Sequence, residues 1–213
     1  MNKLIRQQLI GTILTGLFFV FVLSGIFYHK NAVGAYTEPS MDVTSLSYTC
    51  KRTHGDRNHY AVCDGDTFKV NLKGEGAYAY DLVYKNLPVR LFNVDAPEYY
   101  SPRCAKELKM ALQAKDLLTS LLMADNGSGI RLVNAIRGKY FRVVTDVHVN
   151  GENIKQKLLD SGLYTSYTGR TKRKEWCTGK EVAMWMGIDG DTIRADKRKI
   201  VLEHKRMTAR RNL

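Results

Sequence analysis

The stretch VCDGDTFKVNL at residues 62–72 alternates apolar and polar side chains on both sides of an Asp-Gly pair. Such alternation is typical of two strands that each bury one face and meet at a turn. A further apolar stretch, LPVRLFNV at residues 87–94, predicts a neighbouring strand that ends in a turn at Ala96-Pro97. Residues 73–85, between these stretches, are rich in glycine and tyrosine and predict a long hairpin.

Helical and extended patterns follow one another further along the chain. Apolar side chains at helical spacing predict a helix over residues 102–123, with Pro102 as an early helical residue. Residues 130–134 and 141–149 are expected to be strands, and residues 153–159 a short amphipathic helix. Three strands, a helix, two strands and a helix favour an α+β fold, a five-stranded OB-fold β-barrel with helices. Other small barrels share this order, so it assigns no function by itself.

The N-terminal residues 1–30 are expected to form a transmembrane anchor or a signal segment. Basic residues precede a run without any charged side chain, residues 9–28, and about 20 apolar residues suffice to cross a bilayer as a helix. A cleaved signal peptide competes with the anchor, because Val33 and Ala35 resemble a small-residue cleavage site. Both alternatives place the remainder outside the cytosol, either membrane-anchored or secreted or periplasmic.

The rest of the chain divides by composition. Residues 31–46 contain Gly, Pro and Ser and are interpreted as a linker, and residues 47–177 as the folded domain. Residues 178–213 are interpreted as a basic C-terminal tail, which either is simply solvated or contacts phosphate groups. The formal net charge of the chain is +12, which favours a polyanionic partner, either nucleic acid or an anionic membrane surface.

The chain contains four cysteines, an even number in a protein expected to leave the cytosol, so disulfides are permitted. We favour the pairs Cys50–Cys63 and Cys104–Cys177 among the three possible pairings. An alternative remains for the first pair, because the residue types of a zinc site occur in one short loop. The residues of that alternative set are Cys50, His54, His59 and Cys63.

Acidic and basic residues near the ends of two predicted strands have the chemistry needed to cleave a phosphodiester bond. Asp66 and Asp95 are hard oxygen ligands suited to Ca²⁺. Glu98 is a candidate general base for an attacking water. Arg90 and a second arginine are suited to bind phosphate oxygens as negative charge develops. Strand alternation puts Arg90 and Asp95 on opposite faces, so this site requires a bend or bulge before the aspartate.

From Tyr48 to Trp176 the chain resembles the staphylococcal nuclease-like (thermonuclease) family. The motifs that carry the resemblance are DGDT at residues 64–67, RLFNVDAPE at residues 90–98 and KYFR at residues 139–142. The resemblance implies a calcium-dependent phosphodiesterase that hydrolyses DNA and RNA to 3′-phosphate products.

The same resemblance assigns roles to individual residues. The calcium ligands would be Asp66, Asp95 and the carbonyl of Ala96, with Asp64 and Glu98 nearby through water. Glu98 would be the general base, and Arg90 and Arg142 would stabilise the transition state. The family also stacks tyrosines on the nucleotide, although those of this chain do not match in register. The candidate substrate-binding residues are Lys139, Tyr140, Tyr164 and Tyr167, with packing in the core as the alternative for Tyr164 and Tyr167.

The chain departs from the family pattern at Ala96, where a threonine is common, at the turn before Arg142 and in the hairpin after Asp66. Phe141 stands where the family has a glycine, so a positive φ there would strain the backbone before Arg142. The hairpin that follows Asp66 is longer and contains three tyrosines, either a flap over the substrate or an exposed loop; they are Tyr78, Tyr80 and Tyr84. Residues 188–192 repeat the Asp-Gly-Asp-Thr motif, and we treat this repeat as unrelated to the site because no partner strand follows it.

These observations predict a calcium-dependent endonuclease that acts on DNA or RNA outside the cytosol, as a monomer, with membrane contact through an uncleaved N-terminal helix. The first alternative is an inactive OB-fold module that binds nucleic acid or protein at the membrane surface. A structural membrane-anchored scaffold without metal dependence is the second alternative.

Overall fold

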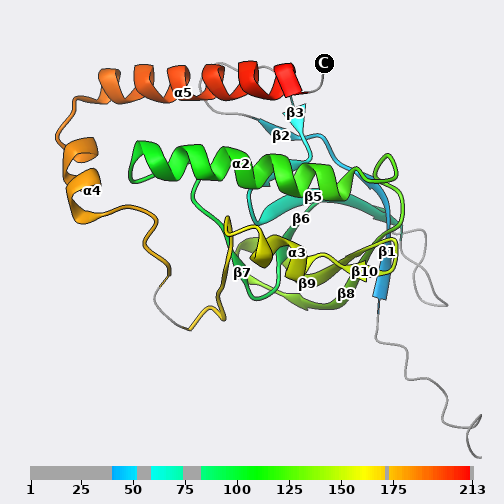
Figure 1. Ribbon diagram of the computed structural model, residues 1–213. Coiled ribbons are helices and arrows are strands. Elements are labelled where there is room, and N and C mark those ends of the chain that lie inside the picture. The colour runs from blue at the N-terminus through cyan, green and yellow to red at the C-terminus, as the bar shows by residue number, and fades with distance from the viewer. Residues whose placement is uncertain (1–39, 52–58, 74–82, 171–172, 212–213) are drawn as a thin grey trace, which may run out of the picture. The chain divides into compact units, whose positions relative to one another are not determined.

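The computed structural model describes residues 40–51, 59–73, 83–170 and 173–211 (Figure 1). Five strands form a closed barrel in the order β1-β8-β9-β6-β5, and β5 pairs back with β1. All neighbours are antiparallel except β6 and β9, which run parallel. The barrel strands are β1 (Ser40–Leu46), β5 (Thr67–Lys73), β6 (Val83–Leu91), β8 (Ile130–Arg137) and β9 (Val143–Val149). The predicted five-stranded barrel with helices is thereby confirmed.

Shorter strands pair with the barrel strands or with each other. β4 (Val62–Asp64) forms a hairpin with β5, and β10 (Glu152–Asn153) adds to β9. Two further sheets contain two strands each. They are β7 (Val94–Asp95) with β11 (Thr165–Ser166), and β2 (Cys50–Lys51) with β3 (His59–Tyr60).

The N-terminal boundary of the barrel differs from the sequence expectation. We expected residues 31–46 to be a linker, but residues 40–46 form β1, which closes the barrel by pairing with both β8 and β5. Only Val43 and Leu46 of this strand are buried, so its sequence lacks the regular alternation of a half-buried strand. A strand can form here because its backbone groups bond to neighbours on both sides.

The barrel interior is filled by alternate residues of the strands, and helix α2 (Ala105–Leu122) covers it. Phe68, Val70 and Leu72 of β5 are buried, as period-two alternation requires. From α2, Leu118 and Leu122 pack into the same core. The helix begins later than predicted, because Cys104 has an extended backbone and its sulfur accepts a hydrogen bond from the Glu107 amide. Pro102 therefore lies before the helix.

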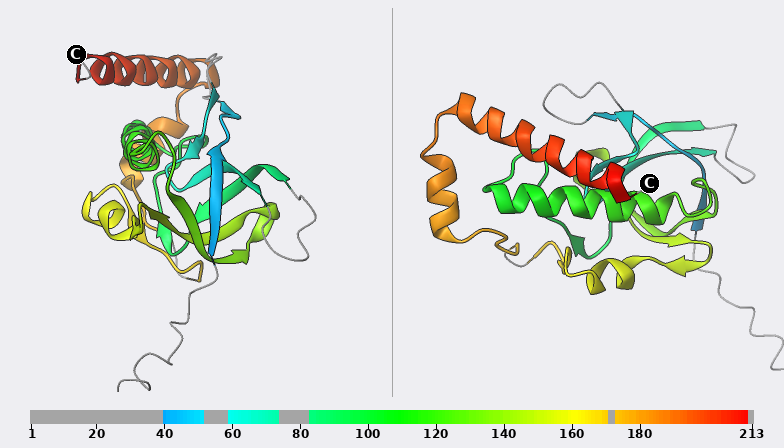
Figure 2. Two further views of the ribbon diagram at one scale, coloured as in Figure 1. Left: turned by 90° about the vertical axis from the view of Figure 1, so that its right-hand side faces the viewer. Right: turned by 45° about the horizontal axis from the view of Figure 1, so that its top comes forward.

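Helices α3 (Lys155–Asp160), α4 (Gly179–Met186) and α5 (Gly190–Arg211) follow β10. We expected residues 178–213 to be a basic tail. The structure shows instead that residues 179–211 are largely helical. The α5 helix lies alongside α2 (Figure 1, Figure 2). Trp185, Ile200 and Val201 form a second core with Leu108 and Leu112 of α2. Three apolar side chains spaced among many charged ones give too weak a pattern to predict this packing.

The repeated motif at residues 188–192 starts α5. The Asp189 carboxylate accepts hydrogen bonds from the backbone amides of Asp191 and Thr192 and from the Thr192 hydroxyl. These bonds satisfy amides that lack partners in the first turn of a helix, so the motif acts as a helix cap. A capping role agrees with our interpretation that the repeat is unrelated to the site.

Several expectations concern residues outside the described ranges. They are the transmembrane anchor or signal segment at residues 1–30, most of the linker, His54, and the hairpin residues Tyr78 and Tyr80. Tyr84, the third tyrosine of the hairpin, is exposed on β6. None of the helices within the described ranges combines the length and apolar character needed to span a bilayer.

Both favoured disulfides are present. Cys50 is bonded to Cys63, and Cys104 to Cys177. The described part of the chain contains no free cysteine. The zinc alternative is thereby overturned, since both of its thiols are used in the Cys50–Cys63 bond, as an oxidising compartment favours.

Candidate active site

The turn between β4 and β5 holds two acidic side chains in fixed positions. The Asp64 carboxylate accepts hydrogen bonds from the amides of Gly65, at 2.9 Å, and Tyr99, at 3.3 Å. The Asp66 carboxylate accepts one from the Thr67 hydroxyl, at 2.9 Å. A Cβ at Gly65 would lie only 2.7 Å from the Cβ of Ala96. The motif therefore needs glycine here, because its backbone packs directly against the loop that follows β7.

A bend between Arg90 and Asp95 brings these residues to the same side of the barrel. β6 ends at Leu91, and Asn93, with φ of 56°, turns the chain before β7. Arg90 then contacts Asp66 at 2.6 Å through Nη1 and Asp95 at 3.1 Å through Nη2. The bend required by the sequence argument is present, and Arg90 lies between the two proposed metal ligands.

A second arginine, Arg173, lies at the same carboxylates. Its Nε lies 3.1 Å from both Asp95 oxygens, and its Nη2 lies 2.5 Å from Oδ1. Its Nη1 donates to Oε1 of Glu98 at 2.6 Å. The Asp95 side chain is 1% exposed, so it is a buried anion bound by two guanidinium groups. Arg173 thus joins Asp95 and Glu98, whose proposed roles are metal ligand and general base.

Burial and mutual repulsion shape the charge of the cluster. Burial, followed by the charges of Asp66 and Glu98, raises the pKa of Asp64 to about 7. Burial also raises the pKa of Asp66 and outweighs the opposing effect of Arg90. The pKa of Arg173 is raised above its ordinary value, and the main cause is its hydrogen bonds to Asp95. Four carboxyl groups therefore lie at the site beside two arginines, and burial disfavours the charged forms of Asp64 and Asp66.

Polar side chains of α2 hold the loops around these carboxylates. Buried Glu107 accepts hydrogen bonds from the amides of Glu98, at 3.3 Å, and Arg103, at 2.6 Å. Lys115 donates to the carbonyls of Val62, at 2.9 Å, and Cys63, at 2.5 Å. One helix therefore fixes both acidic segments, β4 on one side and the loop containing Glu98 on the other.

The two tyrosines proposed to stack on a nucleotide have different surroundings. Tyr164 is 4% exposed, and its hydroxyl lies 2.7 Å from the Ala114 carbonyl and 2.9 Å from that of Gly65. Burial raises its pKa. Substrate stacking by Tyr164 is therefore wrong, because the ring packs in the core beneath the acidic turn, as our alternative had it. Tyr167 is half-buried, and the guanidinium carbon of Arg173 lies 6.0 Å from its ring centroid.

Arg142 does not contact the carboxylates. It lies at the end of a short 3₁₀ turn, Lys139–Phe141, and its guanidinium carbon is 5.5 Å from the Tyr140 ring centroid. Within the described ranges it forms no ion pair, and its buried Nε has no hydrogen-bond partner. Lys139 and Tyr140 are exposed on this turn. The structure therefore brings together Asp66, Asp95, Glu98 and Arg90, and the second arginine that contacts these carboxylates is Arg173 rather than Arg142.

The remaining proposed ligand, the carbonyl of Ala96, belongs to a buried residue directly after Asp95. Within the described ranges, no three His, Cys, Asp or Glu side chains converge closely enough to form a metal site by themselves. Arginine guanidinium groups lie between the carboxylates instead.

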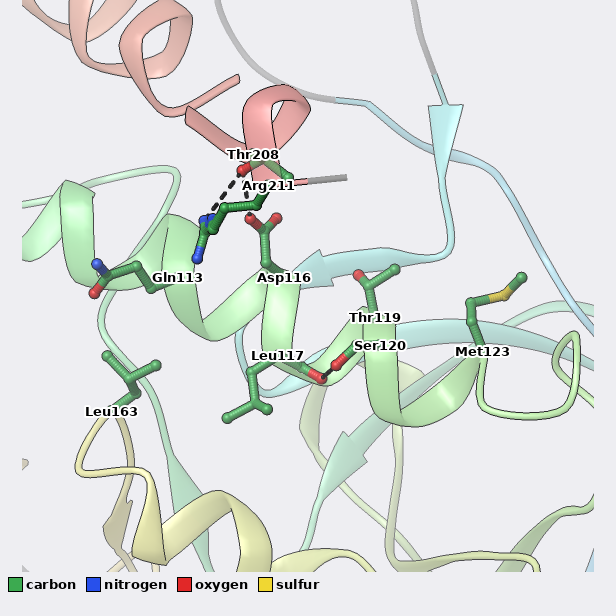
Figure 3. Close-up of a pocket in the computed structure, with 9 residues that line it drawn as sticks. All are labelled: Gln113, Asp116, Leu117, Thr119, Ser120, Met123, Leu163, Thr208 and Arg211. Carbon is green, nitrogen blue, oxygen red and sulfur yellow. Dashed lines mark hydrogen bonds between the residues drawn. The ribbon is translucent and has the colours of Figure 1, made fainter. Parts of the chain in front are cut away.

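A groove of about 640 Å³ lies elsewhere, over α2 and the end of α5 (Figure 3). At its rim Asp116 accepts hydrogen bonds from Thr208, at 3.3 Å, and from His204, at 2.6 Å if Nε2 carries the proton. Arg211 and Gln113 also line the groove. None of the proposed catalytic residues is among those that line it.

Sequence reasoning missed Arg173 because it lies in a basic run, RTKRK at residues 170–174, in which no single arginine is distinguished. The bonded Cys177, four residues further on, fixes this segment beside α2. The short spacing between Arg173 and Cys177 could have indicated that this arginine lies near the start of α2. It is informative only once the partner of Cys177 and the path of the chain are known.

A comparison with family models gave a match to the staphylococcal nuclease homologue family over residues 88–182. The matched segment contains Arg90, Asp95, Glu98 and Arg173, whereas Asp64 and Asp66 precede it. No curated protein matched the chain. The resemblance drawn from the motifs is confirmed, and residues 88–182 of the chain match the model of the staphylococcal nuclease homologue family.

Proposed function

We propose that this protein is a calcium-dependent endonuclease that hydrolyses DNA or RNA to 3′-phosphate products. The observation that carries the proposal is the convergence of Arg90 with Asp66, Asp95 and Glu98 around one location. The match to a nuclease homologue family and the net charge of +12 support a nucleic acid substrate.

The chemistry of these carboxylates suits a hard divalent cation. Burial is the main cause of the raised pKa values of Asp64 and Asp66, and neighbouring carboxylates add to it. A divalent cation beside these carboxylates would favour their charged forms. Ca²⁺ prefers six to eight oxygen ligands, including carboxylates, backbone carbonyls and water. Asp66, Asp95 and the Ala96 carbonyl would hold the ion directly, and Asp64 would bind through water. When bound, the ion supplies positive charge beside the phosphate oxygens.

Each remaining side chain has a role that its position supports. Glu98, with a side chain 35% exposed, is accessible to a water and would accept its proton. Arg90 would donate two hydrogen bonds to phosphate oxygens, and these strengthen as charge builds in the transition state. Arg142 remains the proposed second arginine, and Lys139, Tyr140 and Tyr167 remain proposed contacts to the nucleotide. Arg142 would have to turn away from Tyr140 to reach the phosphate.

A plasmid digestion assay with the full chain, in Ca²⁺ and in chelator, tests this function. Asp66→Asn and Arg90→Ala should each lower the rate by about 100-fold or more, since each removes a contact that stabilises the transition state or the ion. Asp42 and Arg131 offer matched controls, because they form an exposed ion pair on the barrel surface at 2.9 Å. Asp42→Asn and Arg131→Ala should retain full activity. Full activity in Arg90→Ala would refute the site assignment.

One observation favours the alternative, an inactive module that binds nucleic acid or protein. Among the described residues Arg142 contacts no carboxylate, and Phe141 before it has a left-handed backbone with φ of 56°. Metal-independent retardation of plasmid DNA in a gel-shift assay, with no cleavage in the digestion assay, would support this alternative over the nuclease.

The setting of this activity follows from the disulfides. Two disulfides indicate folding in an oxidising compartment, and we propose that the domain acts outside the cytosol. Anchoring by residues 1–30, or their removal as a signal, remains part of this proposal, as does a monomeric state.

A further inference from the structure

Helix α5 carries a row of arginines along the side that faces solvent. Arg194, Arg198, Arg206 and Arg210 lie at multiples of four residues, with Leu202 in the middle of the row, and all five side chains are exposed. Residues four apart are neighbours on the surface of a helix, so these side chains form one continuous row. At a rise of about 1.5 Å per residue the row is about 24 Å long.

The opposite side of α5 is packed against α2, which fixes the direction in which the arginine row points. Ile200 and Val201 are buried in the second core. His204 is 6% exposed and its Nε2 lies 2.6 Å from the Asp116 carboxylate of α2, to which Thr208 donates at 3.3 Å. Figures 1 and 2 show α5 on the far side of α2 from strands β8 and β9. The row is therefore held on an outer surface of the folded unit.

Few carboxylates neutralise the arginine row. Asp191 pairs with Arg194, and Glu203 is the other acidic residue that is fully exposed on the helix. The remaining three arginines of the row form no ion pair with any described residue. The row also contains two pairs of like charges four residues apart, and such pairs destabilise a helix. The helix dipole favours Arg210 in the last turn but not the arginines before it, so helix stability does not account for the row.

A nucleic acid is the partner whose chemistry suits this surface. Guanidinium groups bind phosphate through paired hydrogen bonds, and a duplex carries about 14 phosphates over about 24 Å of its axis. Lipid headgroups also offer phosphates, but a helix that lies in a membrane interface buries an apolar face there. The apolar side of α5 is already packed against α2, and Leu202 alone interrupts the arginine row.

We infer that the arginine row of α5 binds the phosphate backbone of a nucleic acid at a distance from the bond that is cleaved. All of the proposed catalytic and metal-binding residues precede α4 and α5 in the chain, so the row contacts a part of the polymer that is not cut. Phosphate contacts carry no sequence information, so the row holds substrates of any sequence. The inference rests on the proposed nuclease function and adds a preference for long substrates over short ones.

A double variant, Arg198→Gln with Arg206→Gln, tests the arginine row. Glutamine is a good helix former and the change removes like-charge repulsion, so the variant should unfold thermally no earlier than the parent. Fluorescence anisotropy of the full chain with a long labelled DNA duplex, in chelator to prevent cleavage, measures affinity. Loss of two phosphate contacts should reduce the slope of log affinity against log salt by about 2 and weaken binding by about 10-fold or more at low salt.

Two controls separate these contacts from a general loss of charge. Arg131→Gln with Lys157→Gln removes the same charge from exposed residues that already pair with carboxylates, and this variant should bind as the parent does. Arg198→Lys with Arg206→Lys keeps both charges and should retain the salt dependence of the parent.

Cleavage in Ca²⁺ provides a second readout. The double glutamine variant should digest plasmid DNA more slowly than the parent at low substrate concentration, because it captures the polymer less tightly. It should cleave a short fluorogenic oligonucleotide, which cannot span the active site and α5 together, at the rate of the parent.

Unchanged duplex affinity and salt slope in the double glutamine variant would overturn the inference while leaving the proposed function intact. An equal loss in the Arg131 and Lys157 control would attribute the effect to net charge and would also overturn it. A parent that binds duplex through the row but cuts no substrate in Ca²⁺ would refute the proposed function and leave the row as a nucleic acid contact. Loss of binding to anionic lipid vesicles, with duplex binding retained, would reassign the row to a membrane surface.

Discussion

Asp95 binds two guanidinium groups, those of Arg90 and Arg173, although its side chain is 1% exposed. A buried carboxylate needs such partners, because an unpaired charge in the interior is strongly destabilising. A divalent cation at the same carboxylate would have to displace at least part of this pairing. Arg173 is 43% exposed and, within the described ranges, its guanidinium hydrogen bonds go to Asp95 and Glu98, whereas Arg90 is 18% exposed. Arg173 can therefore leave toward solvent at a smaller cost than Arg90.

We therefore predict that Arg173→Gln increases the affinity for Ca²⁺. The substitution removes the guanidinium that competes for Asp95 and Glu98 and also one positive charge next to the ion. Calorimetric titration of Ca²⁺ into the full chain measures the change, with Arg170→Gln as a matched control three residues earlier in the same basic run. Weaker Ca²⁺ binding in Arg173→Gln would mean that the arginine organises the site rather than competing for it.

The raised pKa of Asp64 makes stability depend on pH. Its folded-state value of about 7 exceeds the ordinary 3.8, so the folded protein binds this proton more tightly than the unfolded chain. The free energy of unfolding should therefore fall as pH rises from about 4 to about 7, and the penalty is complete above this window. Asp64→Asn keeps the acceptor oxygen for Gly65 and Tyr99 and should flatten this dependence.

Urea unfolding of the parent and Asp64→Asn at several pH values, with chelator present, checks this prediction. The variant should gain stability over the parent at about pH 8 and lose that advantage at about pH 4. A constant difference between the two proteins across this range would show that the carboxyl does not titrate there.

Some residues of the site could be identified from the sequence and others could not. Asp66, Arg90, Asp95 and Glu98 belong to short motifs in which local chain geometry decides where the side chains lie. Arg173 reaches the site from a distant segment, and only the folded path of the chain reveals it. Tyr164 was misjudged because its sequence position allows both stacking and core packing, and its buried hydroxyl contacts decide for the core.

Strand β1 shows where pattern reasoning failed. The sequence SMDVTSL buries only Val43 and Leu46, three residues apart, which matches neither a strand nor a clear helix. By contrast, the alternation in β5 predicted that strand. The apolar run at residues 87–94 predicted a strand that overlaps β6, although β6 begins earlier, at Val83, and ends earlier, at Leu91. Few side chains of β1 are buried, and backbone pairing with β8 and β5 holds the strand in the barrel.

Adjacent residues of β1 provide a matched test of barrel closure. Val43→Asp buries a charge in the main core and should destabilise the fold by about 3 kcal/mol or more. Thr44→Asp, at an exposed neighbour in the same strand, should change stability by about 0.5 kcal/mol or less. Chemical denaturation of both variants measures the difference. Equal, small effects would show that residues 40–46 do not close the barrel.

Two apolar cores make up the folded unit, and α2 contributes to both. Leu118 and Leu122 face the barrel, whereas Leu108 and Leu112 pack against α4 and α5. The disulfide between Cys104 and Cys177 joins the start of α2 to the residue before the α4 cap. Composition alone indicated a basic tail because charged residues dominate these helices. The few apolar residues that dock them become recognisable only when α2 is seen to offer a second face.

Closure of the barrel by its first strand has a consequence for biosynthesis. Ser40 pairs with Val133, so a nascent chain emerging from the ribosome or a translocon carries β1 with one unmatched edge until β8 has been delivered. Hairpins such as β5–β6 can assemble earlier, since their partners are close in sequence. Closure of the barrel therefore waits for a long-range pairing, and the unpaired edge of β1 is the part of the polypeptide that a holdase chaperone would need to shield.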